Sequence, residues 1–215
     1  MWTETLGYRD HRPPYIERFF ASVAEAIPLT GREDLLDLGA GVGEVALRFA
    51  PFVGSLTAMD AEQPMLDELE KRAQAAGVSI RLVHAKVEEA PLDLGRFPFI
   101  TIGNAHWHMH SSETFTRLEQ WLTPGGRILV CAPHNNPDGL EWPRVFKTTR
   151  EKWAKRSLDF NKLSMEQFFQ GTAFEPVKQI VARGQRKLEL EDLLQRALGY
   201  STTSSAVLGK WRPRR

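Results

Sequence analysis

The sequence predicts an α/β fold in which a doubly wound, mostly parallel sheet carries helices on both faces. Short apolar runs alternate with segments of helical periodicity, and a glycine-rich loop separates the first apolar run from the helical segment after it. Because each crossover helix returns the chain to the same edge of the sheet, this alternation favours parallel strands. The length of 215 residues suits one such domain with an added segment.

The apolar pattern sets the order of the expected elements. An amphipathic helix is expected over 15–27, where apolar residues recur every three or four positions before the turn at 28–31. The expected strands are 35–38, 55–59, 80–83, 97–102 and 128–132. The expected helices between them are 44–50, 65–76 and 113–122. After them, 137–171 is predicted to be a helical insertion that forms a lid over the carboxyl edge of the sheet, followed by a strand over 174–181 and a helix over 190–198.

Charge and composition exclude several classes of protein. The formal net charge is +1, so no strong field is available to hold a nucleic acid or an anionic membrane. The first residues lack the pattern of a secretory signal, and no apolar run approaches the length of a membrane span. The single cysteine, Cys131, lies in an apolar run and is expected to be buried in a strand, with no internal disulfide. We therefore expect a cytoplasmic protein without nucleic-acid or membrane partners.

The glycine loop runs from Asp37 to Gly43, between an expected strand and helix. Gly39 and Gly41 permit a tight turn and a close approach of backbone to a ligand, and Gly43 allows close packing at the helix start. The Gly-x-Gly-x-Gly spacing differs from the dinucleotide pattern that holds a pyrophosphate, which disfavours a nicotinamide-dependent oxidoreductase. Asp37 instead suits a ligand with an ammonium group. The alternative is a tight turn without a ligand.

A second acid, Asp60, ends the next apolar run, seventeen positions after Gly43. A carboxylate at this place can accept hydrogen bonds from both hydroxyls of a ribose. The alternative role is the N-cap of the helix that follows. The loop and this acid together predict a nucleoside-containing cofactor.

These features resemble the class I S-adenosylmethionine-dependent methyltransferases over residues 8–132. The matching segments are the loop 37–43, Asp60, the helix start at 64–66, Val87–Leu92 and Leu122–Arg127. The resemblance implies a Rossmann-like methyltransferase fold and S-adenosyl-L-methionine as the cofactor, with S-adenosyl-L-homocysteine as its product. It also implies methyl transfer to oxygen, nitrogen or carbon of a small-molecule acceptor.

The resemblance implies a cofactor-binding role for a defined set of residues. They are Asp37, Gly39, Ala40, Gly41, Gly43, Asp60, Ala61, Met65, Val87, Glu88, Asn104, Tyr8 and Arg12. In this assignment the loop lies along the methionine part, Asp37 contacts its ammonium directly or through water, and Asp60 holds the ribose. Lys86 stands where the family commonly has an acid that contacts the adenine, so the Val87 backbone or Glu88 is expected to replace it.

The two ends of the chain also compare with the family. The segment from Tyr8 to Tyr15 resembles one that folds over the cofactor, where Arg12 pairs with the cofactor carboxylate or is merely a surface charge. Related chains continue to a last antiparallel strand, which this chain is expected to lack, and an uncovered sheet edge would favour a homodimer.

The expected organisation is one domain over 1–215, with an N-terminal lid and helix over 1–30, a cofactor-binding core over 31–136, the insertion over 137–171, and a strand, helix and tail over 172–215.

Three histidines follow the fourth expected strand, at positions 106, 108 and 110. Residues at the carboxyl ends of parallel strands line the ligand crevice, so this run should face the transferred methyl group. His106 or His108 is expected to act as a base where the acceptor must lose a proton, with Trp107 as an aromatic wall. Similar small-molecule methyltransferases have Phe-His-Trp here, so the order in this chain is swapped. Polar loop residues without a catalytic role are the alternative.

Two further possibilities concern this run. In an extended segment the three histidines would project to one face as metal ligands, although no acid with supporting spacing accompanies them, and we expect no metal. The swapped order also keeps open a protein of the same fold that binds S-adenosylmethionine without transferring its methyl group or that carries out another reaction.

Overall fold

The computed structural model describes residues 14–133, 141–153, 163–185, 187 and 189–198. The chain divides into two compact units. One contains Tyr15–Ala132 and Leu163–Arg183, and the other contains Met1–Pro14, Pro133–Lys162 and Gly184–Arg215. The first unit carries the sheet and is described first.

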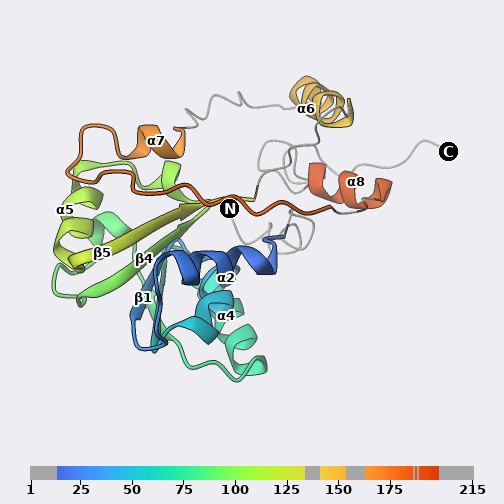
Figure 1. Ribbon diagram of the computed structural model, residues 1–215. Coiled ribbons are helices and arrows are strands. Elements are labelled where there is room, and N and C mark those ends of the chain that lie inside the picture. The colour runs from blue at the N-terminus through green and yellow to red at the C-terminus, as the bar shows by residue number, and fades with distance from the viewer. Residues whose placement is uncertain (1–13, 134–140, 154–162, 186, 188, 199–215) are drawn as a thin grey trace. The chain divides into compact units, whose positions relative to one another are not determined.

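The sheet has five parallel strands in the order β3-β2-β1-β4-β5 (Figure 1). The strands are β1 Asp34–Leu38, β2 Ser55–Asp60, β3 Arg81–His84, β4 Phe97–Gly103 and β5 Leu122–Cys131. All five expected strands are confirmed. The difference lies in β5, which begins six residues earlier than its apolar run because Leu122 already pairs with Phe97, ahead of an irregularity in the register.

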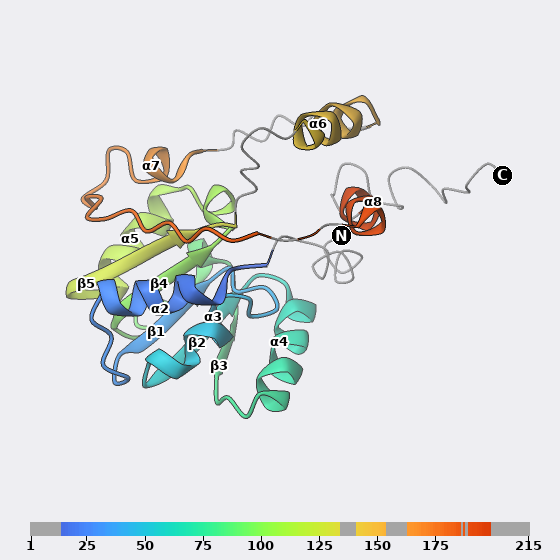
Figure 2. The same ribbon diagram turned by 45° about the vertical axis from the view of Figure 1, so that its right-hand side comes forward.

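Helices cover both faces of this sheet, which confirms the doubly wound fold (Figure 2). One face carries α2 Glu17–Ala26, α3 Ala46–Phe49 and α4 Gln63–Ala75, and the other carries the 3₁₀ turn η3 Val87–Glu89 and α5 Ser112–Trp121. Side chains alternate along β1. Leu35 packs in the hydrophobic core between the sheet and α2, and Leu36 packs in the core between the sheet and α5. The helix expected over 44–50 is shorter than predicted, because α3 gives way to a 3₁₀ turn, η2 Ala50–Phe52, that contains a proline.

The strand expected over 174–181 is wrong. After α7, Met165–Phe168, the chain from 174 to 185 forms neither helix nor strand. Phe174 packs against the core on the α5 face and Ile180 against the core on the α2 face, so this segment passes from one face to the other on the β5 side of the sheet (Figures 1 and 2). Val177 between them is 75% exposed. A segment that changes faces cannot keep a regular ladder with one strand.

The second unit contains α6 Trp142–Trp153 and α8 Leu190–Leu198. The helix expected over 190–198 is confirmed, and α6 and α7 confirm the helical character of 137–171. The role of the insertion as a lid, and the division of the chain into its expected segments, stay predictions. Tyr8, Arg12 and the basic end 211–215 lie outside the described residues. Within the described ranges, every helix is too short or too polar to span a bilayer.

Candidate cofactor and acceptor site

The glycine loop leaves β1 in a backbone conformation that favours glycine. The φ angles are +64° at Gly39, +56° at Gly41 and +86° at Gly43, all in the left-handed region. A Cβ on Gly39 would lie 2.7 Å from the Cβ of Ala105, and one on Gly43 would collide with Leu69 of α4. The loop therefore requires glycine both for its turn and for its close packing.

Asp60 ties this loop to the end of β2. Its Oδ2 accepts a hydrogen bond from the Gly41 amide at 2.7 Å, and its Oδ1 accepts one from the Glu62 amide at 2.9 Å. The N-cap position of α4 belongs to Glu62, so the alternative role of Asp60 as that N-cap is wrong. Asp60 is half-buried at the carboxyl end of its strand, directly beside the loop.

Asp37 lies beneath the loop and is 1% exposed. Its Oδ1 accepts a hydrogen bond of 2.7 Å from the Thr101 hydroxyl, while its Oδ2 has no hydrogen-bond partner among the described residues. Burial raises the pKa of Asp37 to about 7, helped slightly by the Asp60 charge and opposed by the Thr101 hydroxyl and the Ala46 amide. Thr101 was missed in the sequence, because its role follows only from the register that places it beside Asp37.

Three further expected cofactor residues lie in the loop or near it. Ala40 is buried, and its amide donates to the Met59 carbonyl at 3.0 Å. Met65 is buried at the start of α4. Ala61 is exposed just beyond β2, and its carbonyl lies 3.0 Å from Nε2 of His84. Of these three residues, Ala61 is the one that presents an exposed side chain.

The residues expected at the adenine end lie in and beside η3. Lys86 is exposed and pairs with Glu89 at 2.8 Å, and this hydrogen-bonded partner raises its pKa. Val87 is buried in the α5 core. Glu88 accepts a hydrogen bond from the Thr114 hydroxyl of α5 at 3.2 Å, so its carboxylate is turned toward that helix.

The histidine run is a turn and not an extended segment. Residues His106–His108 form a 3₁₀ turn, η4, so the premise of the metal alternative is wrong. His106 is buried, whereas His108 and His110 are exposed, so the three rings do not share one face. The half-buried Trp107 ring packs against His106 at 4.7 Å between centroids and lies 5.8 Å from His108.

His106 joins this turn to a distant part of the chain. Its Nε2 lies 3.0 Å from the Leu163 carbonyl, and its ring contacts Phe168 of α7 at 5.7 Å. A carbonyl only accepts, so Nε2 carries the proton and, in the neutral ring, Nδ1 is the unprotonated nitrogen. That Nδ1 is buried without a hydrogen-bond partner in the described part of the chain. Burial lowers the pKa of His106, which favours this neutral form.

The histidine turn lies directly against the glycine loop. Besides Ala105, the methyl carbon of Met109 would come within 3.2 Å of a Cβ on Gly39. Asn104 precedes the turn with a φ of +54°, and its amide donates to the Cys131 carbonyl at 2.7 Å, which joins the ends of β4 and β5. The loop and the turn are therefore in close packing contact at the carboxyl edge of the sheet.

Cys131 ends β5 and is buried, as predicted. Its carbonyl also accepts a hydrogen bond of 3.3 Å from the hydroxyl of Tyr15, which precedes α2. Burial raises the pKa of Cys131 to about 12 and moves that of Tyr15 upward as well. Both groups are therefore uncharged at neutral pH.

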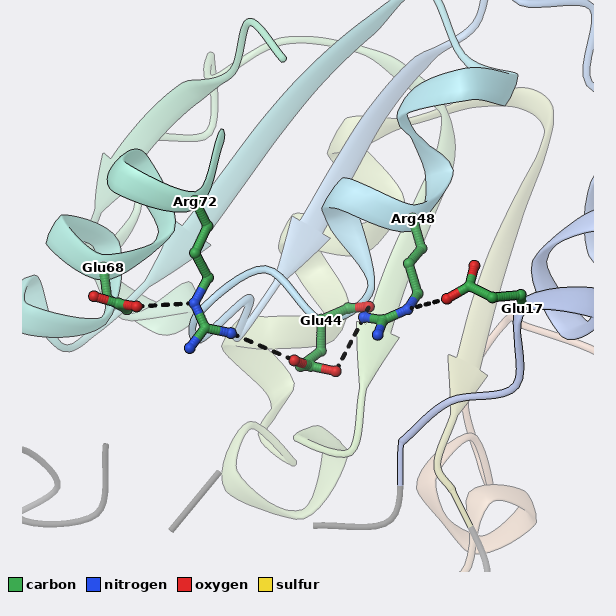
Figure 3. Close-up of polar contacts among 5 residues, drawn as sticks. All are labelled: Glu17, Glu44, Arg48, Glu68 and Arg72. Atoms are coloured by element: carbon green, nitrogen blue, oxygen red, sulfur yellow. Dashed lines mark hydrogen bonds and ion pairs between the residues drawn. The ribbon is translucent and has the colours of Figure 1, made fainter. Parts of the chain in front are cut away.

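A series of consecutive ion pairs links the helices that surround the glycine loop (Figure 3). Arg48 of α3 pairs with Glu17 of α2 at 2.9 Å and with Glu44 at 3.0 Å. Glu44 also lies 3.6 Å from Arg72 of α4, which pairs with Glu68 at 2.9 Å. Because Glu44 directly follows Gly43, these ion pairs link the end of the glycine loop to helices on either side.

Comparison with known proteins shows which family this part of the chain resembles. Residues 35–126 match a family model described as a methyltransferase domain. An uncharacterised methyltransferase of Mycobacterium tuberculosis is 30% identical over 112 residues, which are 52% of this chain and 56% of that protein. The demethylmenaquinone methyltransferase of Clavibacter sepedonicus is 30% identical over 112 residues, 52% of this chain and 45% of that protein. The chain thus spans about half the length of these curated relatives.

A solved structure shares the fold. The YjhP protein of E. coli has a TM-score of 0.51 and 23% identity, over 60% of this chain and 55% of that one. The matched residues 35–126 contain the glycine loop and both acids. The family model over residues 35–126, the parallel sheet and this loop together support a methyltransferase domain of the class I S-adenosylmethionine-dependent type.

Proposed function

We propose that this protein transfers the methyl group of S-adenosylmethionine to a small-molecule acceptor. The observation that carries the proposal is the contact between the glycine loop and the histidine turn, at Gly39 and Ala105. A methyl donor held by the loop would present its sulfonium beside groups suited to an acceptor. The name of the demethylmenaquinone methyltransferase relative supports a small molecule as the acceptor.

Two features of the loop fit the cofactor. Asp37 has one buried carboxylate oxygen with no hydrogen-bond partner among the described residues, which suits the ammonium group of the methionine part. Asp60 stands beside the loop at the end of β2, the position from which an acid reaches ribose hydroxyls in related α/β folds. When bound, S-adenosylmethionine supplies a methyl group on a cationic sulfur that an acceptor lone pair can displace.

The histidine turn is proposed to hold the acceptor. His108 is exposed and so is accessible as a base for an acceptor that loses a proton. His106 is buried with Nε2 engaged, which suits a role in supporting the turn. Trp107 lies between them and is proposed to exclude water from the reacting groups.

The first test is calorimetry with S-adenosylmethionine and S-adenosylhomocysteine, followed by detection of S-adenosylhomocysteine with panels of hydroxyl, amine and carbon acceptors. We expect saturable 1:1 binding and turnover with at least one class of small acceptor. The absence of binding would contradict both cofactor use and transfer. Binding without turnover on any small acceptor would favour the alternative, a cofactor-binding protein without transfer to small molecules.

A further inference from the structure

The pair formed by Thr101 and Asp37 is the most deeply buried polar contact of the site. Thr101 is 0% exposed and Asp37 is 1% exposed, on adjacent parallel strands and in direct register. The Thr101 hydroxyl donates to Oδ1 of Asp37 at 2.7 Å. The second oxygen, Oδ2, is buried with no partner in the described ranges, although an ionised carboxylate can accept several hydrogen bonds.

Among the described residues, no cation compensates the charge of Asp37. The titratable groups that act on it, or on which it acts, come from three neighbouring elements. They are Asp60 at the end of β2, Tyr15 before α2 and Cys131 at the end of β5. None of these groups is cationic, and the Ala46 amide of α3 supplies only a backbone hydrogen bond without a net charge. Such a carboxylate is costly to ionise unless a ligand brings the missing positive charge.

We propose that Thr101 is a positioning residue that holds Oδ1 of Asp37 so that Oδ2 is left for the ammonium group of the cofactor, and that cofactor binding requires Asp37 to be ionised. This inference rests on the proposed function, because it takes S-adenosylmethionine as the ligand of the loop. It concerns how the loop gains its affinity and not which acceptor is methylated.

The proposal predicts a specific pH dependence of cofactor affinity. Asp37 ionises at about pH 7 in the unliganded protein, so the affinity for a cationic group should fall as the pH decreases through that value. The Thr101 hydroxyl lowers the pKa of Asp37. Its removal would raise this pKa further, and the pH at which affinity is half lost would move upward.

The test is calorimetric titration with S-adenosylhomocysteine, which retains the amino group, from pH 5.5 to 8.5. The variant Thr101→Val removes the hydroxyl with little change of shape. A lost hydrogen bond to a charged group should raise the midpoint by about one pH unit and weaken binding about fivefold at pH 7, approaching about tenfold at pH 5.5. Thr101→Ser keeps a hydroxyl and should restore the wild-type profile.

The matched control is Thr57→Val, since Thr57 is a buried threonine of β2 in register with Leu36 and so lies on the opposite face of the sheet. It should keep the wild-type profile. Asp37→Asn provides a second measurement if Thr101→Val fails to fold, and its residual binding should no longer depend on pH in this range.

Two outcomes would overturn the inference. Thr101→Val could bind as the wild type does, or more weakly by the same factor at every pH, which is what a merely structural role predicts. Asp37→Asn could also keep the wild-type pH dependence. Failure of the wild-type protein to bind either cofactor form would instead contradict the proposed function itself.

Discussion

The glycine loop and the histidine turn lie against each other, yet they are held in place by different kinds of contact. The loop is fixed at shorter range along the chain, through the hydrogen bond from the Gly41 amide to Asp60, nineteen positions away. The turn is fixed by residues far along the chain, through the contacts of His106 with Leu163 and Phe168. The proposed cofactor side thus depends on contacts of shorter range along the chain than the proposed acceptor side.

Cofactor affinity and acceptor use should therefore respond differently to substitutions in the two regions. Changes in residues 163–168 should reshape the proposed acceptor side while the loop keeps its bonds. Changes in the loop act on both, because Ala105 and Met109 pack on Gly39. The predictions below compare the two regions, from the largest expected effect to the smallest.

Gly39→Ala is expected to have the largest effect. The added Cβ meets Ala105 at 2.7 Å and the φ of +64° disfavours alanine, so the loop and the turn must both shift. We expect a loss of stability of about 2–4 kcal/mol and a cofactor affinity lower by about 100-fold. Thermal unfolding and calorimetry with S-adenosylhomocysteine measure the two effects.

Gly77→Ala is the matched control for this variant. Gly77 has a φ of +66° but open space around its Cβ position, so it carries the backbone cost without the collision. Its stability should fall by about 1–2 kcal/mol with unchanged cofactor affinity. Equal effects of the two variants on affinity would mean that the loop and the turn are not coupled through Gly39.

His106→Phe tests the long-range contacts of the turn alone. The ring packing on Phe168 is kept while the hydrogen bond to the Leu163 carbonyl is lost. A hydrogen bond worth about 1 kcal/mol predicts about a fivefold drop in kcat/KM for the acceptor, with cofactor affinity nearly unchanged. His110→Phe, an exposed position in ring contact with the same Phe168, serves as the control and should leave both values near wild type. A parallel loss of cofactor affinity in His106→Phe would break the distinction between the two regions.

Glu44→Gln is expected to have the smallest effect. Its carboxylate bridges Arg48 and Arg72 but is 38% exposed, and ion pairs of this kind contribute at most about 1 kcal/mol. The dissociation constant for S-adenosylhomocysteine should rise two- to threefold at low salt, by about 0.5 kcal/mol, and converge with wild type at high salt. Glu68→Gln removes the pair at the end of the same series and should not change affinity. A larger effect of Glu68→Gln than of Glu44→Gln on affinity would mean that the ion pairs of Glu44 do not support the loop.

The parts of the fold that local sequence dictates were predictable. A positive φ at Gly39 and Gly43 follows from the motif, since few other residues adopt that conformation. The strands followed from their apolar runs, including the buried β1 and β4. The start of β5 did not, because Leu122 is followed by a Thr-Pro-Gly-Gly-Arg stretch with no strand pattern and pairs only through the register with β4.

The parts that depend on tertiary contacts were not predictable. The expected strand over 174–181 has the composition of a strand, yet its two ends pack on opposite faces of the sheet. The histidine run becomes a turn because His106 is buried against Phe168, about sixty residues away. Thr101 carries no signal in the sequence that distinguishes it from other strand residues, because only the register between β1 and β4 places it beside Asp37.

The unpartnered oxygen of Asp37 has a consequence for the evolution of this fold. The folded protein holds the Asp37 proton up to about pH 7, whereas the carboxyl group would otherwise release it near pH 3.8. The free energy of unfolding therefore falls as the pH rises between those values, and the aspartate makes the unliganded protein less stable at neutral pH. Selection for stability alone would replace this residue. Its retention in a descendant would mark continued use of the cofactor, and its loss would mark a protein that has given up methyl-donor binding.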